Sequence, residues 1–394
     1  MFRIARYGIA VAALISGALS AAAPAQSQPN QPNQQTQPQY VVGAAQQILA
    51  GGVVDSLPAT VRGPHGKLLF IMSNASSEEF TQKPSGALMN PRIILRSGPK
   101  GSVDYCGVHP VGTIVKLTWK HWITFYHGEQ ADPYVNGGVC DRLPPYNQST
   151  RWAVYKLQTF DAGLTWHKGG QVLGQDRQFV GWSANPQATA NINRDDAGSP
   201  RLVVRSGYMY MFYRAVNQQS PDQQQMSVAR ASLRSTGAPG LWRKWYCSDP
   251  EDPTTCGFTQ PGLGGMQTHV PGLVAEARGI TWNTYLQSYV TVRAWSDGLW
   301  MQTSQGSNLL AWSPPVLVLP LGGSSGQWPH AVCDPSHPQP DYPMAAGYGA
   351  TIGLDGSSTT TGSRFWVYYM LKPKGQCFSS RYLMRREVSL TGGL

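Results

Sequence analysis

The chain has 394 residues, of which only 13% are charged, about half the ~25% of an average soluble protein. Its 43 glycines and 30 prolines suit short strands joined by many turns, and amphipathic helical patterns are nearly absent. The formal net charge of +10 favours anionic partners, but Lys and Arg form no dense run, so we do not expect a nucleic-acid-binding protein.

Residues 1–25 have the pattern of an export signal. Arg3 and Arg6 precede the apolar run Ile9–Ala23, and Ala23-Pro24-Ala25 fits a small-residue cleavage site. The run is shorter than the ~20 residues of a membrane-spanning helix, and no second long apolar stretch follows. Cleavage would remove both arginines and lower the charge from +10 to about +8. We therefore expect a secreted or periplasmic protein without a membrane span.

Residues 26–39 (QSQPNQPNQQTQPQ) contain no apolar side chain larger than proline, so we expect a disordered linker. Gly43–Ala50 is the only later stretch with a helical pattern. The remaining domain, residues 40–394, exceeds the ~250–300 residues that usually share one core. A β-propeller can hold this length in one domain because each blade has its own small core.

Short apolar or alternating runs bounded by Gly, Pro, Asn or Asp predict strands in this domain. Examples are Lys67–Met72 (KLLFIM), Trp122–Tyr126 (WITFY), Tyr208–Tyr213 (YMYMFY) and Arg364–Leu371 (RFWVYYML). A weak repeat ends on Trp166, Trp242 and Trp312, which are 76 and 70 positions apart. With a first unit near residues 52–105 and a last near 342–390, the pattern predicts five units. We expect an all-β, five-bladed β-propeller, with six blades or a β-sandwich as alternatives.

Six cysteines without a C-x-x-C pair in an exported chain predict three disulfides. Cys247 and Cys256 flank the short loop Ser248–Thr255 and form the best-supported pair. Pairing the others in sequential order gives Cys106–Cys140 and Cys333–Cys377, although other pairings stay open. The histidines are scattered and no His-Glu-x-x-His motif is present, so we expect neither a metal site nor a cofactor.

Two segments resemble turns of known propellers. Thr159–Trp166 (TFDAGLTW) resembles the Asp-box of sialidases and related propellers, Ser-x-Asp-x-Gly-x-Thr-Trp, with Thr159 in place of Ser. Ser304–Pro315 (SQGSNLLAWSPP) resembles a turn of family 43 and family 32 glycoside hydrolases, with Asn308 where Asp is common. These resemblances imply a five-bladed, glycosidase-like propeller, and they bear on the fold more than on the activity.

The resemblance also implies carboxyl groups near the starts of the innermost strands. One group acts as acid toward the leaving oxygen and another as base or nucleophile. We assign Asp55 to the first blade, Asp196 or its neighbour Asp195 to a middle blade, where it tunes the acid, and Glu276 to the acid itself. Glu276 lies among small apolar residues, which favour the protonated carboxyl. The structural alternative is that the aspartates cap turns and Glu276 pairs with Arg278.

Four tryptophans beside turns or histidines are candidates for a sugar-stacking platform: Trp119, Trp122, Trp182 and Trp328. We expect a monomeric glycosidase acting on a polysaccharide or glycoconjugate, which the positive charge allows to be anionic. The alternative is a non-catalytic carbohydrate-binding or envelope-associated propeller. A sialidase is a third hypothesis, for which the following residues are available: Arg96, Arg205, Arg293, Arg381, Tyr368 and Tyr369.

Overall fold

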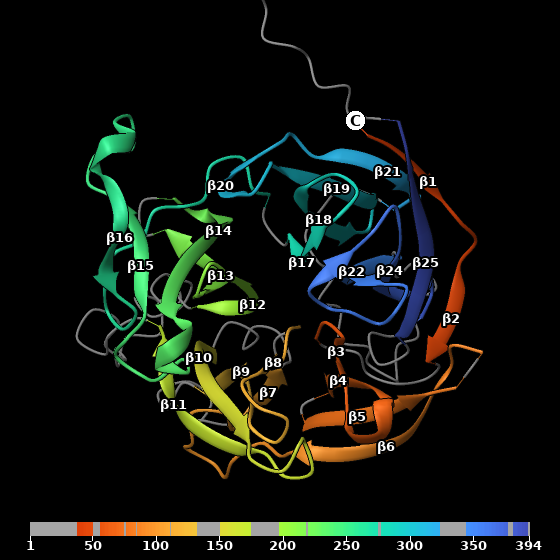
Figure 1. Cartoon of the computed structure of the whole chain (residues 1–394), viewed down its shortest axis with the longest axis horizontal. Helices are drawn as coiled ribbons and strands as arrows, with labels where there is room; N and C mark the ends of the chain where they lie inside the picture. The colour runs from red at the N-terminus through yellow and green to blue at the C-terminus, as the bar shows by residue number, and fades with distance from the viewer. Residues whose placement is uncertain are drawn as a thin grey trace, which may run out of the picture. The chain divides into compact units, whose positions relative to one another are not determined.

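The computed structural model describes residues 38–49, 56–74, 76–83, 85–110, 112–131, 150–174, 197–217, 220–274, 277–323, 344–376 and 381–392. Within these ranges the chain forms five largely antiparallel sheets, and its helical elements are the short 3-10 turns Pro64–Gly66 (η1), Leu233–Ser235 (η4) and Pro253–Thr255 (η5). No helix in these ranges is long and apolar enough to cross a lipid bilayer. The sheets follow one another around a centre as the blades of a five-bladed β-propeller (Figure 1).

Blades 1 to 3 are each continuous in sequence, with their first strands innermost. Blade 1 contains β3 (Ala59–Arg62), β4 (Leu68–Asn74), β5 (Ser76–Gln82) and β6 (Leu88–Leu95). Blade 2 contains β7 (Gly107–Pro110), β8 (Val115–Lys116), β9 (Trp122–Ala131), β10 (Thr150–Thr159) and β11 (His167–Leu173). Blade 3 contains β12 (Gly198–Arg205), β13 (Tyr208–Asn217), β14 (Ser220–Ser232), β15 (Arg243–Cys247) and β16 (Cys256–Pro261).

Blades 4 and 5 are linked to distant parts of the chain. Blade 4 contains β17 (Arg278–Asn283), β18 (Ser288–Trp295), β19 (Gly298–Gln305), β20 (Asn308–Trp312) and β21 (Val316–Pro320), and the two-residue β23 (Thr360–Thr361) pairs in parallel with β17. Blade 5 contains β22 (Ala345–Gly353), β24 (Arg364–Lys372) and β25 (Tyr382–Thr391), and its outer edge is completed by β1 (Gln39–Val42) and β2 (Gln46–Leu49).

The N-terminal strands therefore close the ring. β1 pairs with β25 from Gln39 opposite Thr391 to Val42 opposite Val388, and it begins at the last residue of the expected linker. Without β1 and β2, β25 would present unpaired backbone groups at a sheet edge. The helical interpretation of Gly43–Ala50 is wrong, because Gln46–Leu49 is a strand held by this edge.

The core consists of five apolar clusters, one between each pair of adjacent blades in the described residues. The repeat of tryptophans is confirmed in these clusters. Trp166 packs between blades 1 and 2, Trp242 between blades 2 and 3, and Trp312 between blades 3 and 4. Because both faces of a blade are covered, its strands are apolar on both sides, as in Tyr208–Tyr213.

Candidate functional site

The inner strands of blades 3, 4 and 5 share one irregularity near their first residues. Each carries a β-bulge of one extra residue relative to its neighbouring strand, between Gly198 and Arg201 in β12, Arg278 and Thr281 in β17, and Gly347 and Ala350 in β22. Bulges re-aim side chains and are common next to active sites. The inner strands begin at one end of the blades, and we call this end the rim. It includes Ser56, His109, Ser199, Arg278 and Tyr348.

The second residue of each bulge has a left-handed backbone. The φ angle is 48° at Ser199, 62° at Gly279 and 51° at Tyr348. Gly279 also needs its small size, because an added Cβ would lie 2.5 Å from the backbone nitrogen of Thr351 on the next inner strand. Ser199 and Tyr348 adopt this conformation with side chains, at a cost of roughly 1–3 kcal/mol each. Strain of this kind clusters at functional sites.

Arg278 connects three blades at the rim. Its side chain is buried, and Nη2 donates a 3.1 Å hydrogen bond to Ser199 Oγ of blade 3. Its guanidinium carbon also lies 4.5 Å from the ring centroid of Tyr348 in blade 5. A cation between a hydroxyl and an aromatic face is held in one orientation. Arg278 therefore fixes the start of β17 relative to both neighbouring inner strands.

The axis of the propeller is nearly closed below the rim. Side chains from all five blades surround a cavity of about 10 Å³ there, too small for more than one water molecule, and they include Leu57, Thr113, Arg201, Ile280 and Thr351. The hydroxyls of Thr281 and Thr351 lie 2.9 Å apart and join blades 4 and 5 across this level. Among the described residues, the inner strands therefore pack closely together at this level.

A buried polar network occupies the rim where blade 1 meets blade 2. Ser73 Oγ lies 2.7 Å from His109 Nδ1, and the Ser73 backbone N–H donates a 2.9 Å hydrogen bond to Ser56 Oγ. On the other side of the imidazole, His109 Nε2 lies 3.4 Å from Glu129 Oε1. His127 Nε2 lies 4.0 Å from the same oxygen. Both imidazoles are buried, and the Glu129 side chain is 15% exposed.

Strand pairing assembles this network. His109 on β7 and His127 on β9 are direct ladder partners, and Glu129 shares their face because side chains alternate along a strand. The ring of Trp152 lies 5.1 Å from that of His127 and 4.3 Å from the guanidinium carbon of Arg214, which extends the network to blade 3. A carboxylate near two imidazoles can take part in proton transfer close to neutral pH.

This group was not predicted from the sequence because its members meet only through sheet register. His109 and His127 lie 18 positions apart, and no local motif marks either one. Among the described side chains, no group of three or more His, Cys, Asp or Glu residues is arranged to hold a metal ion.

Most of the predicted site residues lie outside the described residues: Asp55, Asp195, Asp196, Glu276, Trp182 and Trp328. The residues that directly follow Asp55, Asp196 and Glu276 in sequence are described and lead into the rim. Ser56 directly follows Asp55 and takes part in the polar network. In sequence, Asp196 stands two residues before the first bulge residue of β12, and Glu276 stands two residues before that of β17.

The other two tryptophans of the expected sugar platform lie away from the rim. Trp122 begins β9, whose far end carries Glu129, and Trp119 lies in the turn before it. The assignment of Trp122 to sugar binding is wrong, because its side chain is only 1% exposed in the core between blades 1 and 2. Trp119 is 75% exposed, with Lys120 Nζ 4.4 Å from its ring centroid.

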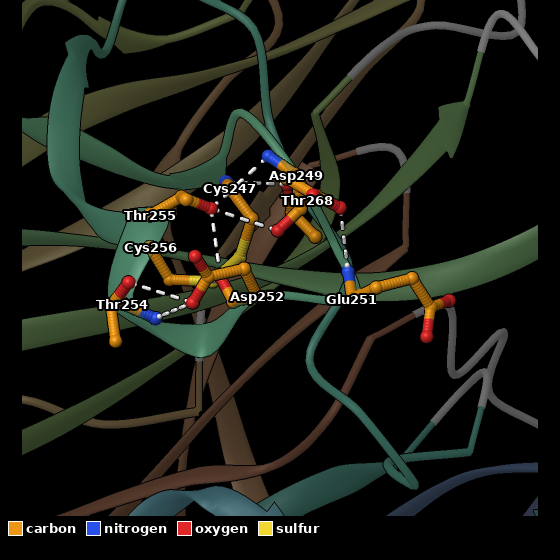
Figure 2. Close-up of a disulfide and its surroundings, with 8 residues drawn as sticks. All are labelled: Cys247, Asp249, Glu251, Asp252, Thr254, Thr255, Cys256 and Thr268. Carbon is orange, nitrogen blue, oxygen red and sulfur yellow. Dashed lines mark hydrogen bonds between the residues drawn. A yellow bond between two sulfur atoms is a disulfide. The ribbon is translucent and has the colours of Figure 1, made fainter.

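The predicted disulfide Cys247–Cys256 is confirmed. The two cysteines are ladder partners at the end of the β15–β16 hairpin, with Cα atoms 3.9 Å apart. Figure 2 shows the loop between them, in which Asp249 and Asp252 accept hydrogen bonds from nearby backbone N–H groups. Cys106 is also disulfide-bonded. The pairs Cys106–Cys140 and Cys333–Cys377 stay predictions, because Cys140, Cys333 and Cys377 lie outside the described residues.

The turn from β10 to β11 is organised by Asp161. Its carboxylate accepts the backbone N–H of Thr165 at 2.8 Å, the Thr165 hydroxyl at 2.6 Å and the Thr159 hydroxyl at 2.7 Å. Burial acts to raise the pKa of Asp161, but the hydrogen bonds from Thr165 and Thr159 outweigh it and lower the pKa from 3.8 to about 2. This turn follows the end of β10 that lies away from the rim, so its role is structural.

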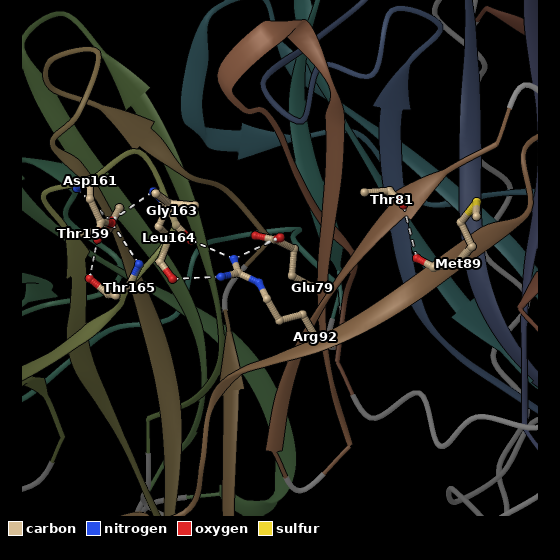
Figure 3. A network of polar contacts seen from close by, with 9 residues as sticks. All are labelled: Glu79, Thr81, Met89, Arg92, Thr159, Asp161, Gly163, Leu164 and Thr165. Carbon is tan, nitrogen blue, oxygen red and sulfur yellow. Dashed lines mark hydrogen bonds and ion pairs between the residues drawn. The ribbon is translucent and has the colours of Figure 1, made fainter.

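Blade 1 holds the same turn through Arg92. The guanidinium donates hydrogen bonds to the carbonyl oxygens of Leu164 and Gly163, at 2.8 and 3.0 Å, and Figure 3 shows these contacts. Glu79 Oε1 lies 3.0 Å from Arg92 Nη2 and orients the guanidinium from its own blade. The arginine therefore joins blades 1 and 2 at the end opposite the rim.

The fold is that of a five-bladed β-propeller, in which the inner strands of three blades carry the same bulge at the rim. The chain is similar to a family 117 glycoside hydrolase of the marine bacterium Zobellia galactanivorans, with a TM-score of 0.50, 11% identity and 91% of each chain covered. It also matches the catalytic domain of a family 62 α-L-arabinofuranosidase of Coprinopsis cinerea, with a TM-score of 0.46, 11% identity, and 89% of this chain and 97% of that chain covered.

These likenesses concern the fold. The first agrees with the fold that the five sheets define, and the second is too distant to add an argument. No sequence profile of a known protein family matches the chain. No curated protein matches its sequence.

Proposed function

We propose that the chain is an exported glycoside hydrolase-like protein that cleaves a polysaccharide or glycoconjugate with carboxyl groups at the rim. The repeated bulge carries this proposal, because Asp196 and Glu276 precede equivalent bulge residues, Gly198 and Arg278, on neighbouring inner strands. Two acids at matching positions fit the paired carboxyl groups of glycoside hydrolysis. The fold likeness to a family 117 glycoside hydrolase supports the same class.

Glu276 is the proposed acid toward the leaving oxygen. It is followed in sequence by the fully buried Ala277 and by Arg278, which Ser199 and Tyr348 hold in place. Apolar surroundings favour the protonated form of a carboxyl, which an acid catalyst requires. Asp196 would tune this acid from blade 3, and Asp55 would serve as base or nucleophile from blade 1. The reaction needs carboxyl groups and water and no cofactor.

His109 and Glu129 are proposed positioning residues. The contacts run from Glu129 through His109 and Ser73 to Ser56, the neighbour of Asp55 in sequence. A change in the protonation of His109 or Glu129 would therefore alter the position of the segment that carries Asp55, the proposed base. His109→Asn should narrow or shift the pH profile of glycan cleavage, whereas a merely structural role would change stability alone.

The partners and location follow from the sequence. The ligand is a glycan, and the charge of about +8 that remains after removal of residues 1–25 suits an anionic one. Residues 1–25 would direct export to the periplasm or medium, and residues 26–39 would link the signal to a monomeric propeller.

The test is release of reducing sugar from a panel of plant, bacterial and host glycans. Glu276→Gln should lower release by about 10²- to 10⁴-fold, the usual contribution of a general acid. Asp196→Asn and Asp55→Asn should also lower it, and Glu251→Gln, in the exposed disulfide loop, is the matched control. Unchanged sugar release in Glu276→Gln, Asp196→Asn and Asp55→Asn would refute the assignment of these carboxyl groups to catalysis. Glycan binding without release by the wild type would establish the carbohydrate-binding alternative.

A further inference from the structure

A second candidate site lies between blades 3 and 4, away from the rim. It is a pocket of about 310 Å³, lined chiefly by Arg205, Tyr210, Arg230, Trp245, Phe258 and Leu309. β12 begins at the rim with Gly198 and ends with Arg205, and seven steps of strand separate these residues by about 23 Å. The size suits a small ligand, since binding pockets usually begin near ~300 Å³.

Arg230 is held against aromatic rings in this pocket. Its guanidinium carbon lies 4.4 Å from the ring centroid of Phe258 and 4.7 Å from that of Tyr208. Stacking orients the planar group and leaves its N–H donors at the edge, where a carboxylate or sulfate can accept two of them.

Arg205 brings a second guanidinium to the pocket. Its Nη2 donates a 2.6 Å hydrogen bond to Ser307 Oγ, in the turn between β19 and β20 of blade 4. In the part of the chain that the structure describes, no carboxylate lies within ion-pairing distance of Arg205 or Arg230. Two cations without an acidic partner here favour an anionic ligand.

The aromatic lining adds a surface for a saccharide ring. Trp245 and Phe258 have ring centroids 5.2 Å apart, and Tyr210 and Phe258 have centroids 5.8 Å apart. Such faces bind the apolar C–H surface of a pyranose, while the arginines bind an oxyanion on its edge.

We propose that this pocket is an ancillary binding site for an acidic saccharide unit, one that carries a carboxylate or a sulfate ester. The site performs no chemistry and does not depend on hydrolysis at the rim. It would hold an anionic glycan on the flank of the propeller.

The test is isothermal titration of the full chain with three probes of equal length: an oligogalacturonate, a sulfated oligosaccharide and a neutral cello-oligosaccharide. At least one acidic probe should bind tenfold or more tightly than the neutral one, and its affinity should fall as salt is raised. The tighter acidic probe identifies carboxylate or sulfate as the preferred group.

Arg230→Met and Arg205→Met should each weaken binding of the acidic probe by tenfold or more. Arg243→Met is the matched control, because Arg243 lies outside the pocket and donates to the Gly240 and Trp242 carbonyl oxygens. If Arg230→Met lowers the melting temperature, Arg205→Met decides the question. Equal binding of the neutral probe, wild-type affinity in both variants, or no binding of either acidic probe would overturn the proposal. Glu276→Gln should leave this binding intact, which separates the site from the proposed hydrolysis.

Discussion

Arg278 of β17 lies with its guanidinium carbon 4.5 Å from the ring centroid of Tyr348 on β22, so a cation and an aromatic face join two inner strands at the rim. Arg278→Met would remove this contact and the hydrogen bond to Ser199. We expect the free energy of unfolding to fall by about 2 kcal/mol, roughly 1 from each contact, as measured by urea denaturation. Arg278→Lys keeps the charge and should lose less; equal losses in the two variants would contradict an electrostatic role.

Asp161 makes a prediction about acid stability. Its pKa is lowered from 3.8 to about 2 in the folded chain, so its stabilising contribution is present above pH ~4 and is lost as the pH falls toward 2. Asp161→Asn should therefore be less stable than the wild type at pH 5, and the difference should shrink between pH 4 and pH 2. Urea midpoints across this range measure it, and Thr165→Val, which removes one of the hydrogen bonds, should show a smaller effect.

The Cys247–Cys256 disulfide closes a short hairpin at the outer part of blade 3. For a closed loop of about ten residues, the double substitution to Ser should lower the free energy of unfolding by about 2–3 kcal/mol. Thermal unfolding of the two proteins measures this change. Because the hairpin is far from the inner strands, glycan cleavage below the melting temperature should be unaltered. Lost cleavage at unchanged stability would show that the hairpin contributes to the site.

Substitution of Trp122 should lower the stability far more than substitution of Trp119. Trp122→Ala removes a side chain that is 1% exposed and should cost about 3–5 kcal/mol of stability. Trp119→Ala removes one that is 75% exposed and should change stability by less than about 0.5 kcal/mol. Guanidinium denaturation of both variants gives the comparison. A large loss in Trp119→Ala would mean that its ring is covered in solution.

The fold could be predicted because the signals for it are local. Met209–Tyr213 is apolar at every position since alternate side chains enter the cores on either side of blade 3. The tryptophans at positions 166, 242 and 312 end successive units because each packs into the core between its own blade and the blade before it. Gln46–Leu49 was misread as helical because an edge strand takes its conformation from a distant partner, β25.

The site was harder to predict because it is assembled from several blades. Sequence position alone could not show that Trp122 points into a core while Trp119 remains exposed. The pairing of His109 with His127 depends on the register of β7 against β9, which no local pattern specifies. The equivalence of Gly198 and Arg278 likewise became visible only through their bulges.

The pairing of β1 with β25 sets the order in which the chain can complete its fold. Gln39 pairs with Thr391, so the last contact joins the two ends of the domain. At ~5–20 residues per second, synthesis of 394 residues takes roughly 20–80 s, and β1 has no partner for most of that time. Ring closure is therefore the slowest step we expect in folding, since it has the greatest sequence separation.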